Sequence, residues 1–219
     1  MRILIVAATE REIAPLLARM QAMPGDGSFV DSYTHGLHEV DVLITGVGMV
    51  ATAAWCTRAL AQAPYDLALN LGVCGSFDPF FDPGTVVHVV SDRLSELGAE
   101  DGERFLTLPE LELPGVSEFV NLDPPANPEI DQLPTVTGIT VNTVHGSDMS
   151  IAAMTQRFSP QVESMEGAAF MTSCLMHHVP FAQIRAVSNI IERRNRAAWK
   201  MPEAIANLNA TALRILDLA

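Results

Sequence analysis

Cysteine and basic side chains are scarce in this chain, and each shortage excludes some kinds of site or partner. The three cysteines, Cys56, Cys74 and Cys174, are odd in number and far apart, with no Cys-x-x-Cys pair or Cys/His cluster. This pattern argues against a disulfide framework and a metal site, and it is typical of a reducing cytoplasm. Lysine and arginine together number 13 against 26 acidic residues, which gives a net charge of −13. Nucleic acid and anionic membranes require a basic surface, so neither is expected as a partner.

Long hydrophobic runs are also missing. No segment approaches the ~20 apolar residues of a membrane-spanning helix, and the apolar run in the N-terminal segment MRILIVAATERE is too short for a signal peptide. The composition, 48% apolar and 18% charged, is that of a globular protein, and 219 residues can form one large domain over 1–219. We therefore expect a small-molecule substrate and no cofactor. If the substrate is an anion, local basic groups must offset the general repulsion.

Two kinds of apolar pattern alternate along the chain. Continuous or alternating apolar runs predict strands, and a spacing of 3.6 residues predicts helices. The expected strands are 2–8, 29–36, 39–48, 66–77, 85–92, 135–146 and 180–189, and the expected helices are 10–20, 49–63, 150–158, 161–176 and 202–218. A turn at 24–27 ends the first helix, 190–201 is a loop, and 109–134 is irregular because it holds six of the fourteen prolines. This alternation predicts an α/β fold with a mainly parallel sheet.

In open α/β sheets, ligands bind beyond the carboxyl ends of the strands. That rule selects the segments ATERE, GVCGSF, HGSDM and SNIIERRNRAAW, together with QVESMEGAAF from Gln161 to Phe170. The last segment places Glu163 and Glu166 at the entry to an apolar run, although charged groups are seldom buried without a partner. These two carboxylates are therefore candidates for binding a ligand.

Five motifs in the same order resemble the nucleoside phosphorylase/nucleosidase superfamily, and its hydrolytic branch most of all: AATEREIAPL, GVGMVATA, NLGVCGSF, ESMEGAAF and AVSN. The resemblance covers nearly the whole chain. It implies a three-layer fold with a central mixed sheet flanked by helices, cleavage of a ribosyl N-glycosidic bond, and a homodimer or higher homo-oligomer. VNTVHGSDMS, ESMEGAAF and SNIIERRNRAAW are most similar to members of that branch that release hypoxanthine from futalosine in menaquinone biosynthesis.

Hydrolysis of this bond requires a group that holds the sugar hydroxyls, a base for the water and a partner for the departing purine. A carboxylate accepts hydrogen bonds from two vicinal hydroxyls, and its charge favours a cation-like sugar. The resemblance places Glu166 in this role, with Met165 packed on the sugar, and Glu12 as the water-activating base. Phosphorylases carry a glycine/arginine phosphate loop near Glu12, whereas TEREI has no glycine, which favours water as the nucleophile. Glu10 and Arg11 are expected to be solvated.

Further residues are expected around the ligand by the same resemblance. The glycine-rich loop is expected to line the sugar and the base with Gly72, Val73, Cys74 and Gly75. Cys74 has no evident His/Asp pairing, so it is expected to be a wall residue rather than a nucleophile. Met149 is expected to cover a face of the purine. Two interpretations stay open: Glu163 is either a substrate-binding group or an acid at a helix N-terminus, and His145 either borders the purine or is structural.

The pair Ser188-Asn189 departs from the adenine-releasing relatives, which carry Ser-Asp at this point and use the Asp to protonate the purine. An amide has no acidic proton to give. Asn189 can instead donate to a 6-oxo group and accept from a protonated N7, a pattern that suits hypoxanthine.

Arg193, Arg194 and Arg196 form the densest basic cluster in the chain. They are either a solvated loop or a binding site for the benzoate on the sugar side chain of futalosine, since an arginine fork matches a carboxylate in two-point contact. In the second case, Trp199 packs on the aryl ring.

Three other functions remain open. One is a methylthioadenosine/S-adenosylhomocysteine nucleosidase, and another is a purine nucleoside phosphorylase, whose turnover depends on phosphate. The third is a catalytically silent nucleoside-binding module, against which the presence of both Glu12 and Glu166 counts.

Overall fold

The structure is a computed structural model that describes residues 1–24 and 29–219. Its strands are β1 (Arg2–Ala7), β2 (Gln21–Ala22), β3 (Asp31–His35), β4 (His38–Ile44), β5 (Leu67–Ser76), β6 (Val86–Leu94), β7 (Gly98–Asp101), β8 (Arg104–Thr107), β9 (Glu118–Val120), β10 (Thr135–Thr140), β11 (Val162–Ser164) and β12 (Phe181–Ile190). Its helices are α1 (Glu10–Leu17), α2 (Met49–Gln62), α3 (Pro128–Asp131), α4 (Asp148–Phe158), α5 (Gly167–His177), α6 (Met201–Asp217) and the 3₁₀ turn η1 (Arg196–Ala198). Among the helices so described, none is long and apolar enough to cross a membrane.

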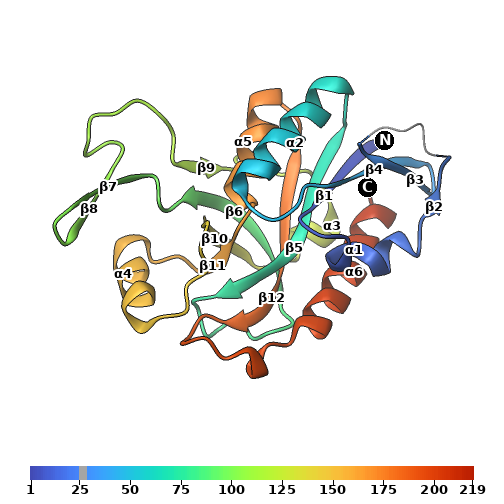
Figure 1. Cartoon of the computed structure of the whole chain (residues 1–219). Coiled ribbons are helices and arrows are strands. Elements are labelled where there is room, and N and C mark those ends of the chain that lie inside the picture. The colour runs from blue at the N-terminus through green and yellow to red at the C-terminus, as the bar shows by residue number, and fades with distance from the viewer. Residues whose placement is uncertain (25–28) are drawn as a thin grey trace.

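One large mixed sheet organises the molecule, in the order β11-β10-β6-β12-β5-β1-β4-β3-β2, with β9 paired to β6 (Figure 1). Its centre, β4-β1-β5-β12, is parallel. Strand β11 also pairs with β5, so β5, β12, β6, β10 and β11 form a closed ring. Valines from these strands pack together in one apolar cluster: Val87, Val89, Val136, Val162 and Val187.

Helices cover both faces of the parallel centre because its strands are apolar on both sides. In β1, Ile3 and Ile5 pack in a cluster with residues of α1 and α6, while Leu4 and Val6 pack in a second cluster with residues of α2 and α5 (Figure 1). Successive side chains of a strand point to opposite faces, so one continuous apolar run supplies both layers. The predicted α/β class, with helices flanking a mainly parallel sheet, is confirmed.

The segment 161–176 corrects one prediction, because it does not form a single helix. Val162–Ser164 is the strand β11, which pairs with Gly138–Thr140, and α5 begins only at Gly167. A strand this short shows no alternation, and the helical spacing of the following residues extends over it by chance.

Smaller corrections concern the ends and the loops. The strand predicted at 135–146 ends at Thr140, and the first helix ends at Leu17. The predicted irregular segment 109–134 contains β9 and α3, and the hairpin β7–β8 was not predicted. The turn predicted at 24–27 lies mostly outside the described residues.

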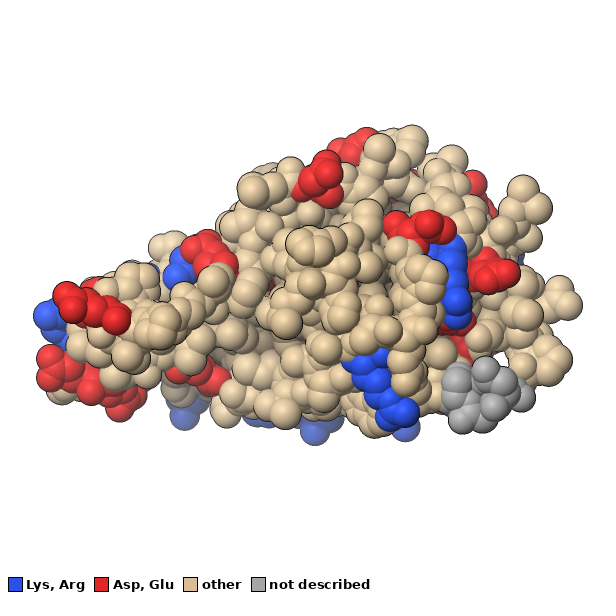
Figure 2. All heavy atoms as spheres, turned by 90° about the horizontal axis from the view of Figure 1, so that it is seen from above, with Lys and Arg blue, Asp and Glu red and all other residues tan. Residues whose placement is uncertain are grey.

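The surface is acidic, in keeping with the composition. Among the described residues on the face in Figure 2, the basic side chains are scattered, and some of them have acidic side chains next to them. That face therefore offers no continuous basic surface of the kind that nucleic acid requires.

Candidate active site

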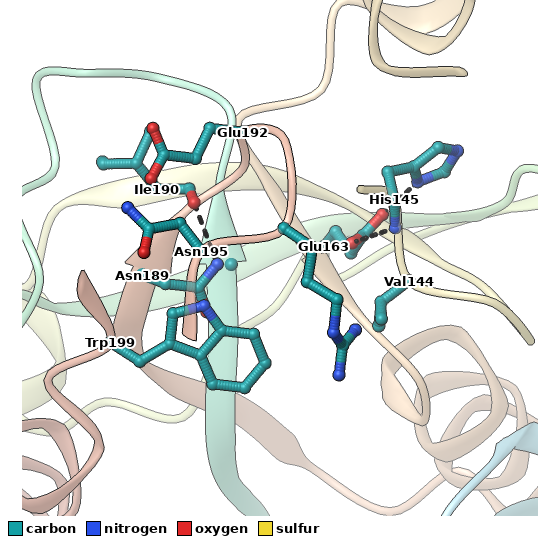
Figure 3. Close-up of a pocket in the computed structure, with 10 residues that line it drawn as sticks. Val144, His145, Glu163, Asn189, Ile190, Glu192, Asn195 and Trp199 are labelled. Atoms are coloured by element: carbon teal, nitrogen blue, oxygen red, sulfur yellow. Dashed lines mark hydrogen bonds and ion pairs between the residues drawn. The ribbon is translucent and has the colours of Figure 1, made fainter. Parts of the chain in front are cut away.

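Two adjoining cavities open where β1, β5, β11 and β12 end. The larger has a volume of about 380 Å³ and the smaller of about 70 Å³. Of the residues predicted from the sequence, the larger cavity is lined by Glu12, Val73, Cys74, Gly75, Glu163, Met165, Glu166, Ser188, Asn189 and Trp199. Gly75, Glu163, Asn189 and Trp199 also line the smaller cavity, together with Arg194 and His145 (Figure 3). The carboxyl ends of separate strands thus bring together residues that are far apart in the sequence.

Glu12 is held in place by its own helix start. Its Oε2 accepts hydrogen bonds from the backbone N–H of Thr9, at 3.0 Å, and from the hydroxyl of Thr9, at 2.9 Å. Its Oε1 accepts a third, at 3.2 Å, from the N–H of Val73 on β5. These donors fix the side chain at the cavity wall. Oε2 already accepts two hydrogen bonds, whereas Oε1 accepts one and keeps a second acceptor site for a ligand or water.

Glu166 precedes α5 and is almost completely buried, with 5% of its surface exposed. Its Oε1 accepts a hydrogen bond of 2.9 Å from the N–H of Gly48, at the start of α2. Its Oε2 lies 3.9 Å from Nη1 of Arg185. The carboxylate is therefore charge-compensated from behind and faces the cavity in front.

Arg185 is a functional residue that our sequence reasoning missed. It lies on β12 with 1% of its surface exposed, and it donates to Oδ1 of Asn70 on β5. Its position was detectable in principle, because a lone arginine in an otherwise apolar buried strand must have a partner.

Gly72 makes room for this guanidinium. A Cβ atom at residue 72 would lie 2.2 Å from Nη1 of Arg185 and 3.1 Å from Oε1 of Glu12. Gly72 lines neither cavity, and its predicted contact with the ligand stays a prediction. Its role is to let Arg185 pass close behind both carboxylates.

Glu163 and His145 form a pair that resolves one open interpretation. Glu163 lies on β11 and not at a helix N-terminus, and it is 97% buried, with 3% of its surface exposed. Its Oε1 accepts a hydrogen bond of 2.9 Å from the backbone N–H of His145, and its Oε2 contacts the ring Nδ1 (Figure 3). The pair ties the loop after β10 to the cavity wall. The helix N-terminal interpretation of Glu163 is therefore wrong, whereas the binding roles of Glu163 and His145 stay predictions.

Asn189 lines both cavities, of which the smaller is drawn in Figure 3. Its Oδ1 accepts a hydrogen bond of 2.8 Å from the hydroxyl of Ser188, and its Nδ2 donates one of 3.0 Å to the carbonyl of Ile190. One N–H and one lone pair remain for a ligand.

Cys74 lines the larger cavity and is itself buried. Burial raises the pKa of its thiol to about 12. A thiol with this pKa stays protonated near neutral pH and is a poor nucleophile.

The structure separates some predicted residues from the cavities and adds others. Met149 is 84% exposed and lines neither cavity, so its predicted cover over a purine is not formed here. Arg193 and Arg196 also line neither, although Arg194 and Arg196 lie over the ring of Trp199, at 5.5 and 5.9 Å from its centroid. The residues that line the larger cavity without having been predicted include Arg11, Val47, Met201 and Ile205.

Comparison with known proteins places this chain in a family. The family model of the phosphorylase superfamily matches residues 2–218. The futalosine hydrolase of Streptomyces coelicolor is 33% identical over 86% of this chain and 85% of its own length, and that of Thermus thermophilus is 32% identical over 80% of each. The fold matches a methylthioadenosine/S-adenosylhomocysteine nucleosidase from Colwellia psychrerythraea, solved in complex with adenine, with a TM-score of 0.79, 22% identity and coverage of 100% of this chain and 95% of that one. The chain therefore belongs to the phosphorylase superfamily and, within it, to the futalosine hydrolase family of N-glycosyl hydrolases.

Proposed function

We propose that this protein hydrolyses the N-glycosidic bond of futalosine and releases hypoxanthine, as a step of menaquinone biosynthesis. The observation that carries the proposal is the joint placement of Glu12, Glu166 and Asn189 on one cavity, with each side chain held by other groups of the protein. Two relatives that are themselves named futalosine hydrolase support the choice of substrate.

The reaction divides among these three residues. Glu166 accepts hydrogen bonds from the sugar hydroxyls, and its negative charge stabilises the cation-like sugar as the bond to the purine breaks. Glu12 takes a proton from a water molecule, whose oxygen then bonds to the anomeric carbon. The electrons of the broken bond go to the purine, which leaves as an anion that accepts a hydrogen bond from Asn189 at its 6-oxo group. The purine then takes a proton from water, and Glu12 gives its proton back to the solvent, so that one water is consumed for each bond broken.

A substrate panel separates this proposal from its alternatives. The protein is incubated with futalosine, methylthioadenosine and inosine, each with and without phosphate, and free base is measured. We expect release from futalosine that does not depend on phosphate. Preferred turnover of methylthioadenosine would indicate the adenine-releasing relatives, and dependence on phosphate would indicate a phosphorylase. Release from no substrate would leave a nucleoside-binding module.

We also propose that the protein works in the cytoplasm as a homo-oligomer. The three cysteines are free and buried, which fits a reducing compartment. Exposed apolar side chains beside the cavity, Val47 at 58% and Val50 at 78%, fit an interface with a second subunit that helps to close the pocket. Sedimentation velocity tests this, and a monomer at micromolar concentration contradicts it.

A further inference from the structure

The larger cavity repels anions because of its carboxylates, and one basic side chain on its wall offsets this repulsion. Three carboxylates line it, those of Glu12, Glu163 and Glu166, in a chain whose net charge is −13. Among the described residues that line it, Arg11 is the only basic one. Arg185 is buried behind the wall and is already engaged with Glu166 and Asn70. An anionic group that enters this cavity therefore has one cation available to it.

The guanidinium of Arg11 is free to accept such a partner. Arg11 is exposed on the first turn of α1, and no carboxylate within the described part of the chain pairs with it. Its neighbour Glu12 is fixed by the N–H and hydroxyl of Thr9, so the backbone that carries Arg11 is held at the cavity rim. An unpaired arginine on a fixed stretch of backbone is suited to bind a carboxylate in two-point contact.

The order of purine, ribose and side chain in the substrate decides whether Arg11 or Arg194 can reach the carboxylate of the side chain. Asn189, the proposed partner of the purine, lies where the two cavities meet, and Glu166, the proposed partner of the sugar, lines only the larger one. The smaller cavity, lined by Arg194, is thus on the purine side. The purine and the sugar side chain leave a ribose from carbons on opposite sides of the ring oxygen. The side chain should therefore extend into the rest of the larger cavity and away from Arg194.

That remaining region is lined by residues that suit an aryl acid. Val47, Met201 and Ile205 supply apolar surface for a ring, and Arg11 supplies the charge. We infer that Arg11, rather than the arginine cluster 193–196, binds the carboxylate on the sugar side chain of the substrate. This inference rests on the proposed function.

Matched substrates and variants test it. Futalosine is compared with its neutral analogue in which the benzoate is a benzamide, in the wild type and in Arg11→Gln, Arg194→Gln and Arg19→Gln. Arg19 is exposed, lies beyond the end of α1 and lines neither cavity, so its substitution controls for the loss of one charge. Arg11→Gln should lower kcat/KM for futalosine by about 10- to 100-fold, mostly through KM, because a hydrogen-bonded charge is lost. It should lower kcat/KM for the benzamide much less, because a neutral amide loses only a hydrogen bond to an uncharged group.

Several outcomes overturn the inference. One is that Arg11→Gln lowers kcat/KM equally for futalosine and for the benzamide. Another is that Arg194→Gln, and not Arg11→Gln, lowers kcat/KM for futalosine alone. Calorimetric binding of futalosine and the benzamide is measured in parallel, so that the inference does not depend on turnover. If the wild type prefers futalosine in binding and loses this preference in Arg11→Gln, the inference stands even where no base is released, and only the proposed function fails. If the wild type binds both equally, the inference fails whether or not base is released.

Discussion

The guanidinium of Arg185 and the carboxylate of Glu166 lie 3.9 Å apart, with 1% and 7% of their side-chain surfaces exposed. Removing one partner of such a pair leaves the other charge buried and uncompensated, which typically costs about 3–5 kcal/mol. We therefore expect Arg185→Met to lower the free energy of unfolding by roughly this amount, as measured by urea denaturation. The double variant Arg185→Met/Glu166→Gln should recover part of the loss. Additive losses in the two single variants would show that the pair is not coupled.

Gly72→Ala probes the same guanidinium without removing a charge. A Cβ atom at this position would lie 2.2 Å from Nη1 of Arg185, so the side chain must shift, at a cost of about 1–3 kcal/mol. Because Arg185 contacts Glu166, we expect kcat to fall more than KM rises. Gly146→Ala is the control, since its Cβ would meet Arg194 at an ordinary 3.5 Å. Equal kinetics of the two variants would contradict the steric argument.

Glu12→Gln should abolish most of the turnover while substrate still binds, because an amide cannot take a proton from water. General-base catalysis of this kind is typically worth ~10²–10⁴ in rate. The matched control is Glu10→Gln, which changes an exposed carboxylate on the same helical turn that lines neither cavity. Steady-state kinetics and calorimetric binding on both variants check this. A rate for Glu12→Gln close to that of Glu10→Gln would remove Glu12 from the mechanism.

The sequence motifs predicted the fold and most residues that line the larger cavity. They did not predict how Arg185 and Gly72 pack behind the cavity wall. Glu12 follows an expected strand and Asn189 ends one, and the rule that ligands bind at strand ends brings these two together. Glu166 was expected at the entry to a helix, and the short strand β11 that precedes it was not predicted. Their roles stay predictions. Arg185 and Gly72 act across two neighbouring strands, and that pairing is a tertiary fact that no local pattern contains. The arginine cluster 193–196 was considered as a binding site because its arginines lie close together in the sequence. Arg11 has no basic neighbour in the sequence that would mark it, yet it lines the larger cavity.

The buried carboxyl group of Asp92 should make a contribution to stability that falls as the pH rises. It is almost completely buried, with 1% of its surface exposed, and burial raises its pKa from the ordinary value of 3.8 to about 6. Between these two values the folded protein binds more protons than the unfolded chain, so this residue's contribution to stability falls as pH rises from about 4 to 6 and is constant above. The change amounts to about 3 kcal/mol.

Asp92→Asn should remove this dependence. Thr140 can still donate to the side-chain oxygen, and Gln183 can turn its amide so that its Oε1, unpaired among the described groups, accepts from the new N–H₂. The stability of the variant relative to the wild type should therefore rise between pH 4 and 6, as measured by denaturation at a series of pH values. His88 makes the opposite contribution over nearly the same range, because burial lowers its pKa to about 4, and it is common to both proteins. A difference independent of pH would contradict the assignment.

Asn189 should set the preference of the enzyme for the purine it releases. Its Oδ1 already accepts from Ser188 and its Nδ2 already donates to Ile190, which orients the amide with one N–H and one lone pair left for the base. The free N–H matches a 6-oxo group, whereas a 6-amino group would present a donor to a donor. A site built for one hydrogen-bond pattern can reject the other by up to ~10⁴-fold. We expect the wild type to prefer futalosine over its 6-amino analogue, and Asn189→Asp to move the ratio of kcat/KM toward the 6-amino substrate, since a carboxyl group can protonate the leaving adenine. Asn195→Asp makes the same change in charge at a more exposed residue that lines the smaller cavity, and it controls for the added negative charge. A wild type that favours the 6-amino substrate, or a ratio that Asn189→Asp and Asn195→Asp move equally, would show that Asn189 only ends its strand.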